Sequence, residues 1–375
     1  MTAKQTSGKR ERMSQQTNTE LRCHCGNMMG RTTPQGIEVK CRRCKRIHVI
    51  PLSILDLAPV GRGSTPADAL RNSIALVQET ERLGYRRHWV AEHHNMPGIA
   101  SAAPAVLIAH VAAGTSTIRV GSGGVMLPHY SAFKVAENFR LLETLFPGRI
   151  DLGLGRAPGT DPVTAHALRR TLAGNVDRFP EDVEELMTYF AEPQPGQRVR
   201  AVPGAGLDVP IWILGSSLYG AQFAAHYGLP FAFASHFAPE MMMDAIHLYR
   251  TGFKPSARLE KSYLMLGFNV LAAETDEEAD YLASSGKRAW INRALARRTQ
   301  LLPPERDFEA NLTDTERAVL ASRTWVGAIG SAATVKAGVA RFVEQTGADE
   351  LIIATGVFEH EARVRSYEIL AGAVA

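Results

Sequence analysis

The sequence has no long apolar run and no apolar segment near its N-terminus. None of its apolar stretches reaches the roughly 18–20 residues that a helix needs to cross a bilayer, so we expect no membrane partner. Residues 1–20 are polar and mildly basic, which excludes a signal peptide and predicts a disordered tail. A cytoplasmic location follows by default. With 45% hydrophobic residues, the chain can still bury a large core.

Cysteine is absent from residues 51–375, which excludes a disulfide scaffold for most of the chain. All four cysteines, Cys23, Cys25, Cys41 and Cys44, lie close together near the N-terminus. Two pairs of thiolates on short turns can form a tetrahedral cage for Zn²⁺. We therefore expect a metal site in this N-terminal module.

Acidic residues are also scarce in the first 50 residues, which carry 11 Lys and Arg against 3 Asp and Glu. This module has a net charge of +8, whereas residues 51–375 have a net charge of −4. Such asymmetry indicates contact with a polyanion through the N-terminal module alone. A solvated basic tail without a partner accounts for the charge equally well.

Residues 21–50 resemble the Com-type zinc ribbons of Mu-like phages, which are small RNA-binding translational regulators. The resemblance is specific over residues 37–50, which include Cys41 and Cys44. It departs at Cys23-His24-Cys25, where the family has two residues between the cysteines. The resemblance implies zinc on the four cysteines, with His24 as an alternative ligand. It also implies RNA binding through basic side chains, namely Arg22, Lys40, Arg42, Arg43, Lys45 and Arg46.

Strand-like and helix-like segments alternate from residue 51 to the C-terminus. A Gly-x-Gly-x-x-Gly turn after the first strand is lacking, which disfavours a doubly wound dinucleotide-binding sheet. The alternation predicts a (β/α)8 TIM barrel with insertions, preceded by the small N-terminal module. The expected strands are residues 52–58, 87–91, 117–127, 149–155, 209–215, 230–235, 263–272 and 350–355. Residues 156–175 are expected to be a long loop, and residues 276–346 a mostly helical section.

In such a barrel, the active site lies where the strands end and the following loops begin. The third strand carries Gly121, Gly123 and Gly124, which indicates a bulge, a tight corner or the close approach of a flat ligand. Ser216 and Ser217 precede a helix, and its N-terminal amides form either a phosphate site or an ordinary N-cap. Arg156, at a neighbouring strand end, favours the phosphate site because a guanidinium can clamp the same anion.

The second strand ends in Glu92-His93-His94-Asn95. Adjacent residues of a strand point to opposite sides, so one histidine points into the barrel mouth and the other away. An imidazole with a pKa near neutrality is a natural acid and base, and we select His93 for this role. Glu92 and Asn95 are candidates for orienting its ring. A phosphate site and glycine backbone for a flat ring together suggest a flavin.

Four motifs make residues 52–375 similar to the bacterial-luciferase-like, flavin-dependent monooxygenases. They are residues 89–95 (Trp-Val-Ala-Glu-His-His-Asn), 120–128 (Val-Gly-Ser-Gly-Gly-Val-Met-Leu-Pro), 147–161 (beginning Pro-Gly-Arg-Ile-Asp) and 210–217 (Pro-Ile-Trp-Ile-Leu-Gly-Ser-Ser). The resemblance implies reduced FMN, O₂ and a small organic substrate, with His93 as the acid and base beside the flavin. The flavin contacts that it implies are Ala58, Gly123, Gly124, Arg156, Arg178, Ser216 and Ser217.

Two positions depart from true luciferases. The reactive cysteine of those enzymes falls at Gly155, which argues against light emission, and a threonine phosphate ligand falls at Gly220. The family also often has a non-prolyl cis peptide at the position of Gly123-Gly124. A separate flavin reductase and a homodimer are the expected partners.

Two other functions remain open at this point. One is hydride transfer with a deazaflavin, which shares the fold and the pocket. The other is an RNA regulator with an accessory barrel. The substrate is set by loops such as residues 156–175, whose sequence has no readable code. We expect residues 276–346 to cover the site and exclude water.

Overall fold

The computed structural model describes residues 20–22, 28–33, 36–40, 47–157, 160–168, 178–204 and 206–374, with side chains from Ile50 onward. The four cysteines lie outside these residues, so the zinc site stays a prediction. Among the described residues, no group of three or more His, Cys, Asp or Glu side chains could hold a metal ion. No helix in this part of the chain is long and apolar enough to cross a membrane.

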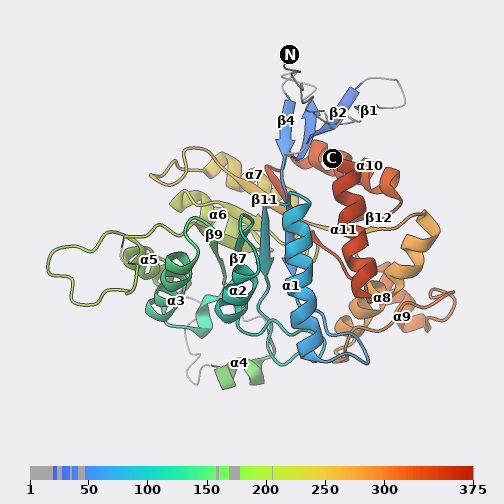
Figure 1. Cartoon of the computed structure of the whole chain (residues 1–375), viewed down its shortest axis with the longest axis horizontal. Coiled ribbons are helices and arrows are strands. Elements are labelled where there is room, and N and C mark those ends of the chain that lie inside the picture. Colours follow the sequence, from blue (N-terminus) through green and yellow to red (C-terminus); the bar gives the residue numbers. More distant parts are fainter. Residues whose placement is uncertain are drawn as a thin grey trace, which may run out of the picture.

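Eight parallel strands form a closed barrel (Figure 1), as the sequence predicts. The strand order is β10-β9-β8-β7-β6-β5-β13-β11, and pairing of β10 with β11 closes the ring. The strands are β5 (Leu52–Asp56), β6 (Arg87–Val90), β7 (Arg119–Met126), β8 (Ile150–Gly155), β9 (Ile211–Gly215), β10 (Phe231–Phe233), β11 (Leu264–Ala272) and β13 (Glu350–Ala354).

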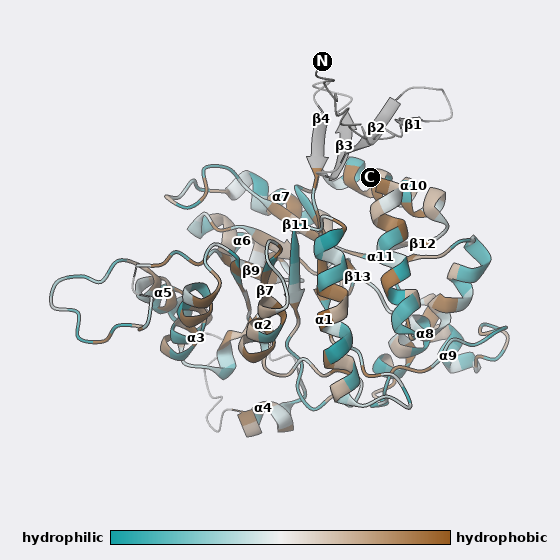
Figure 2. Ribbon diagram, viewed as in Figure 1, coloured by the Kyte–Doolittle hydropathy of each residue, from teal (hydrophilic) through white to brown (hydrophobic). Residues whose placement is uncertain are grey.

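Helices follow the strands and cover the outside of the barrel. Figure 2 shows hydrophilic and hydrophobic residues alternating along α1 and α11, as expected for helices with one face on the sheet. Thr65 and Asp68 form a capping box that starts α1, and Pro66 occupies its first turn. The outer helices are α1 (Pro66–Arg82), α2 (Pro104–Ala113), α3 (Ala132–Leu145), α5 (Phe179–Phe190), α6 (Leu218–Tyr227), α7 (Met242–Gly252), α10 (Ala332–Thr346) and α11 (His360–Val374).

The structure adds elements that the sequence pattern did not predict. A short helix, α4 (Pro162–Leu168), lies in the expected loop 156–175, and Asp161 accepts hydrogen bonds from the backbone amides of Val163 and Thr164. A ninth strand, β12 (Gly327–Gly330), interrupts the expected helical section and pairs with β11 outside the barrel. The rest of that section includes α8 (Asp276–Ala294) and α9 (Asp314–Ala321). Both short elements lack the apolar periodicity on which a prediction depends.

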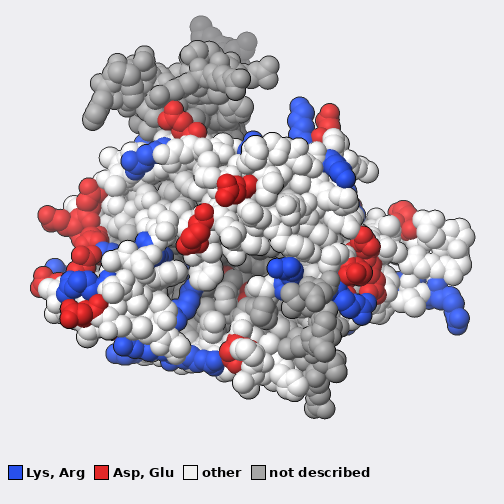
Figure 3. All heavy atoms as spheres, turned by 180° about the vertical axis from the view of Figure 1, so that it is seen from behind, with Lys and Arg blue, Asp and Glu red and all other residues white. Residues whose placement is uncertain are grey.

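The N-terminal module contains a four-stranded antiparallel sheet of β1 (Glu20–Arg22), β2 (Met28–Thr33), β3 (Gly36–Lys40) and β4 (Ile47–Ile50). Only Pro51 separates β4 from the first barrel strand, and Figure 1 shows the sheet beyond the end where the barrel strands begin. The module therefore lies opposite the mouth of the barrel, as the junction predicts. Seen from behind in Figure 3, the molecule is hollowed below its centre, with Lys or Arg side chains at the edge of the hollow.

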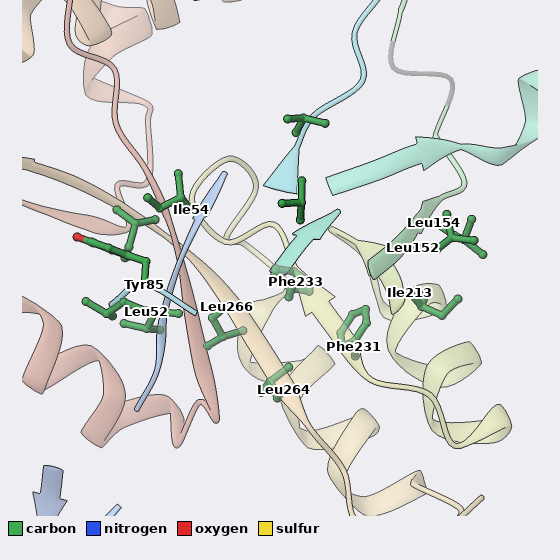
Figure 4. Packing of buried hydrophobic residues seen from close by; sticks show 14 of the residues in the cluster. Leu52, Ile54, Tyr85, Leu152, Leu154, Ile213, Phe231, Phe233, Leu264 and Leu266 are labelled. Carbon is green, nitrogen blue, oxygen red and sulfur yellow. The ribbon is translucent and has the colours of Figure 1, made fainter. Parts of the chain in front are cut away.

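The barrel strands are packed on both faces because their side chains alternate with period two. Leu55, Trp89, Trp212 and Met265 fill the barrel interior, and the two indole rings meet edge to face at 5.1 Å. Figure 4 shows part of the second core, between the strands and the helices. Its labelled members are Leu52, Ile54, Tyr85, Leu152, Leu154, Ile213, Phe231, Phe233, Leu264 and Leu266.

Buried charges close the end of the barrel where the strands begin. Nη1 of Arg87 lies 2.6 Å from Oδ2 of Asp151, and its Nε lies 2.7 Å from Oε1 of Glu350. Burial acts to lower the pKa of Arg87, but the two carboxylates more than offset this effect and raise it above the usual value. The Ser53 hydroxyl and the Tyr263 hydroxyl also donate to Glu350. This packing leaves only the opposite end of the barrel open for chemistry.

Candidate active site

The polar strand ends meet at the open mouth of the barrel. His93 follows β6, Arg156 follows β8, Ser217 follows β9 and His236 follows β10. Gly123 lies near the end of β7, between the strands that carry the first two. Because parallel strands present their C-terminal ends at one rim, these residues surround a single site.

The two adjacent histidines have different partners. Nε2 of His94 lies 2.8 Å from Oε1 of Glu92, and this carboxylate also accepts hydrogen bonds from the Tyr130 hydroxyl and the Met126 amide. The backbone amide of His93 donates to the carbonyl of Ser101 at 3.1 Å. Its buried Nδ1 has no partner among the described residues. Glu92 therefore orients His94, and the expectation that it orients His93 is wrong.

Asn95, the other residue expected to orient His93, is directed elsewhere. Its side-chain amide donates to the Thr164 hydroxyl of α4 at 2.9 Å, and its backbone has a positive φ of 56°. The Thr160 hydroxyl donates to the carbonyl of His94 at 3.2 Å. Asn95 therefore connects the end of β6 to α4, and the His93 ring has no side-chain hydrogen-bond partner among the described residues.

His93 and His236 are both neutral at physiological pH. Burial, with a contribution from the Arg293 charge, lowers the pKa of His93 to about 4. Burial, Arg293 and Arg323 likewise lower the pKa of His236 to about 4, and its buried Nδ1 also has no partner in the described chain. The expectation of a near-neutral pKa for His93 is therefore not met. In the protein without bound anions, His93 is ready to accept a proton rather than to donate one.

The glycines of β7 form a bulge beside the site. The register between β7 and β8 shifts between Ser122 and Val125, and the Gly123–Gly124 peptide bond is cis, as the family resemblance implies. A Cβ atom on Gly123 would lie 2.7 Å from Cδ1 of Leu55, and one on Gly124 would lie 2.7 Å from the Gly153 carbonyl. Glycine is therefore required by the packing beneath the bulge. Gly123 keeps part of its surface accessible, which leaves backbone for a flat ring.

The start of α6 has the features of a phosphate site. Ser217 is its N-cap residue, yet the Ser217 side chain makes no capping hydrogen bond, and Ser216 is exposed. The Cζ atom of Arg156 lies 4.0 Å from the ring centre of Tyr219, in the first turn of the helix. A guanidinium, two hydroxyls and helix N-terminal amides thus lie together, which is the donor set that a phosphate needs. At Gly220, where luciferases have threonine, a Cβ atom would approach Phe231 to 3.2 Å.

Two other residues that we expect to contact the flavin, Ala58 and Arg178, have surroundings that do not by themselves indicate a ligand. Ala58 is fully buried and has a positive φ of 46°, and its amide donates to Oδ1 of Asp56 at 2.8 Å. Arg178 is exposed and is the N-cap residue of α5. The residues between α4 and Arg178 lie outside the described chain. The roles of Ala58 and Arg178 stay predictions.

Three residues at the mouth were not selected from the sequence. His236 follows a strand end, and that position was a usable signal. Arg293 in the last turn of α8 and Arg323 after α9 carried no signal, because both are single charges in a long polar segment. Their proximity to the histidines depends on how residues 276–326 pass over the barrel.

Comparisons with known proteins identify the family and the fold of this chain. The luciferase-like monooxygenase family model covers residues 50–350. A luciferase-like monooxygenase of Escherichia coli strain K12 is 48% identical over 85% of this chain and 96% of its own length. The Bacillus subtilis N-acetyl-S-alkylcysteine monooxygenase is 41% identical over 62% of this chain and 70% of its own length.

Solved structures of other proteins have the same fold. The apo structure of MsnO8 has a TM-score of 0.80 and 36% identity, covering 86% of this chain and 98% of that one. The FMN complex of the oxygenating component of 3,6-diketocamphane monooxygenase from Pseudomonas putida shares the fold, with a TM-score of 0.64 and 18% identity over 87% and 98% of the two chains. The coenzyme F420-dependent tetrahydromethanopterin reductase from Methanopyrus kandleri also shares it, with a TM-score of 0.58 and 13% identity over 87% and 98%. The chain belongs to the luciferase-like monooxygenase family of enzymes.

Proposed function

We propose that this protein is an FMN-dependent monooxygenase that acts on a small organic substrate. One observation carries the proposal: Arg156 lies beside the start of α6, on the same barrel mouth as the Gly123 backbone and the His93 ring, whose Nδ1 has no partner among the described residues. We infer that Arg156 and the start of α6 form a phosphate site. These groups match the three parts of a flavin mononucleotide that need recognition, namely a phosphate, a flat ring and a reacting edge.

Each residue has a role that follows from its position. Arg156 and the α6 amides bind the phosphate, and Ser216 and Ser217 donate hydroxyl hydrogen bonds to it. The surface of Gly123 supports the ring, because a side chain at this position would collide with Leu55. Bound reduced FMN supplies two electrons for the reaction with O₂, in which one oxygen atom enters the substrate and the other leaves as water.

His93 manages the proton beside the flavin and the substrate. Its pKa of about 4 keeps the ring neutral at pH 7, so one of its two nitrogens is free to accept a proton and later return it. Partial burial of the ring keeps bulk water from competing for this proton. We assign this role to His93 rather than to His94, because Glu92 holds Nε2 of His94 in a buried hydrogen bond.

Monooxygenation is favoured over hydride transfer with a deazaflavin. The relatives named as monooxygenases reach 41% and 48% identity, whereas the coenzyme F420-dependent reductase shares 13%. We further propose that a separate reductase supplies the reduced flavin.

Binding and oxygen consumption test this proposal. Wild-type protein is titrated with FMN, riboflavin and a deazaflavin, and oxygen uptake is followed with reduced FMN. We expect FMN to bind about tenfold or more tightly than riboflavin, which lacks the phosphate. Arg156→Gln should weaken FMN binding by a similar factor and leave riboflavin binding unchanged.

Two outcomes contradict the proposal. If reduced FMN neither binds nor consumes O₂ in the wild-type protein, monooxygenation is excluded. If the deazaflavin binds and FMN does not, the proposed function becomes hydride transfer with a deazaflavin instead of monooxygenation. An equal effect of Arg156→Gln on FMN and riboflavin would place the guanidinium on the ring rather than on the phosphate.

A further inference from the structure

Arg293 and Arg323 lie at the barrel mouth without a carboxylate partner. Neither guanidinium makes an ion pair or a side-chain hydrogen bond to any described residue. Other arginines of the same segment are paired: Arg297 lies 2.6 Å from Glu316, and Arg298 lies 2.7 Å from Asp161. Arg297 and Arg298 therefore have carboxylate partners, whereas Arg293 and Arg323 have none among the described residues.

Aromatic rings surround the two guanidinium groups. The Cζ atom of Arg323 lies 4.3 Å from the ring centre of Trp290 and 4.2 Å from that of Trp325. The Cζ atom of Arg293 lies 5.1 Å from the ring centre of Phe237, which in turn contacts Trp290 at 6.1 Å. Stacking uses the flat face of a guanidinium and leaves its N–H edge free to bind a planar anion.

Two of these rings expose much of their surface. Phe237 is 44% exposed and Trp325 is 41% exposed. These rings and the two guanidinium groups form a surface that is apolar and cationic at once, which a ligand of matching chemistry could cover. A molecule that is apolar at one end and anionic at the other would satisfy both the rings and the guanidinium groups.

The two arginines also influence each other and the histidines. Burial, and then the charge of Arg293, lowers the pKa of Arg323 to about 10. Arg293 is exposed to solvent, but nearby protein atoms desolvate its guanidinium and lower its pKa as well. Because Arg293 lowers the pKa of His93 and His236, it lies within electrostatic range of both rings. Two uncompensated cations so close together are stabilised by a bound anion.

The pair lies on a part of the rim that neighbours the phosphate site but uses different strands. Arg156 and the start of α6 follow β8 and β9, whereas Phe237 follows β10 and Arg323 precedes β12 beside β11. The Asn269 side chain of β11 fixes this region by donating to the carbonyls of His236 and Val326. The barrel mouth thus has two neighbouring cationic positions, and His93 follows β6, on the other side of the ring of strands from β10.

We propose that Arg293 and Arg323 bind the anionic group of the organic substrate, while Phe237, Trp290 and Trp325 contact its apolar part. The substrate class is accordingly a small organic acid with an apolar chain or ring. This inference rests on the proposed function, because it assigns the substrate of the same mouth. Substrate binding next to His93 would bring a negative charge to the imidazole and raise its pKa, so the ring would be able to hold a proton only when substrate is present.

A binding experiment without flavin turnover tests the inference. Octanoate, acetate and octanamide are titrated into the full chain, with and without FMN, by calorimetry and by tryptophan fluorescence. Two of the four tryptophans, Trp290 and Trp325, lie at the proposed site. We expect octanoate to bind about tenfold or more tightly than octanamide, and more tightly than acetate.

Arginine variants test whether Arg293 and Arg323 bind the anionic group. Arg293→Gln and Arg323→Gln should each weaken octanoate binding by about tenfold or more and leave octanamide binding unchanged, which also shows that the variants are folded. Arg288→Gln is the matched control: Arg288 lies on α8 over Phe308 at 4.7 Å, but it pairs with Glu305. This control removes the same charge from the same helix and should leave octanoate binding unchanged.

Three results would overturn the inference. They are equal binding of octanoate and octanamide, no binding of any carboxylate, and equal effects of all three arginine variants. Loss of FMN affinity in Arg293→Gln with unchanged octanoate binding would assign this guanidinium to the flavin instead. Failure of the proposed function is distinguishable, because octanoate would then still bind while FMN binding or oxygen uptake is absent.

Discussion

Nε2 of His94 lies 2.8 Å from Oε1 of Glu92, which fixes the second histidine of the pair to a fully buried carboxylate. The adjacent His93 has no such partner among the described residues, and its ring lies within electrostatic range of the His236 ring. One strand end thus carries a structural histidine and a histidine available for chemistry.

This difference predicts opposite results for the two histidines. His93→Asn should slow the oxidation of bound reduced FMN by O₂ by about 10²-fold or more, with unchanged FMN affinity, because it removes the proton acceptor. His94→Asn should instead lower the free energy of unfolding by about 1–3 kcal/mol, because it leaves Glu92 without one of its donors. Stopped-flow absorbance and urea denaturation measure the two effects, and equal behaviour of the variants would contradict the assignment.

The lowered histidine pKa values predict that stability falls in acid. Below the unfolded-state pKa of 6.5, the unfolded chain binds protons at His93 and His236 that the folded protein takes up only near pH 4. The free energy of unfolding should therefore decrease as the pH falls from 6.5 to about 4, by up to about 1.4 kcal/mol per pH unit for each histidine.

Urea denaturation across this pH range checks the prediction. The double variant with His93→Asn and His236→Asn should lose less stability in this interval than the wild-type protein. His247→Asn, at an exposed position on α7, serves as the control. A double variant with the pH dependence of the wild type would show that the two rings titrate normally in the folded state.

Gly267 of β11 is predicted to be required by the position of His236. A Cβ atom at Gly267 would lie 2.0 Å from Nδ1 of His236, so the imidazole would have to move. Gly267→Ala should lower the free energy of unfolding by about 1–3 kcal/mol through overpacking. Gly252→Ala, where the nearest atom is Cβ of Ala225 at 3.7 Å, should have almost no effect. Similar urea midpoints for the two variants would place His236 elsewhere.

The N-terminal module is predicted to be independent of the flavin site. Removal of residues 1–49 should change FMN affinity and oxygen uptake by less than about twofold, because the module lies at the end of the barrel opposite the mouth. Ile50 is kept because it is buried in the barrel core. A large decrease in oxygen uptake would show that the module takes part in the reaction. Zinc content, measured before and after truncation, tests the cysteine site at the same time.

The sequence alone was sufficient for the order of the barrel elements and for several strand-end residues. Strands with alternating or continuous apolar residues and capped amphipathic helices are local patterns, so β5 to β11 and β13 were predicted close to their observed bounds. The glycines of β7 and the histidines after β6 were also recognisable, because each stands out within its own segment. Short elements such as α4 and β12 were missed, since they contain too few residues for a period.

Only the tertiary structure decided which side chains meet at the mouth. Glu92 was expected to orient His93, but the turn after β6 directs it to His94, Tyr130 and the Met126 amide. Arg293 and Arg323 gained significance from the absence of acidic partners, which depends on where α8 and the segment before β12 cross the barrel. Local patterns are set by neighbouring residues, whereas charge pairing depends on contacts between distant segments. The sequence therefore indicated where a site is expected, and the fold decided which charged side chains pair with one another among the described residues.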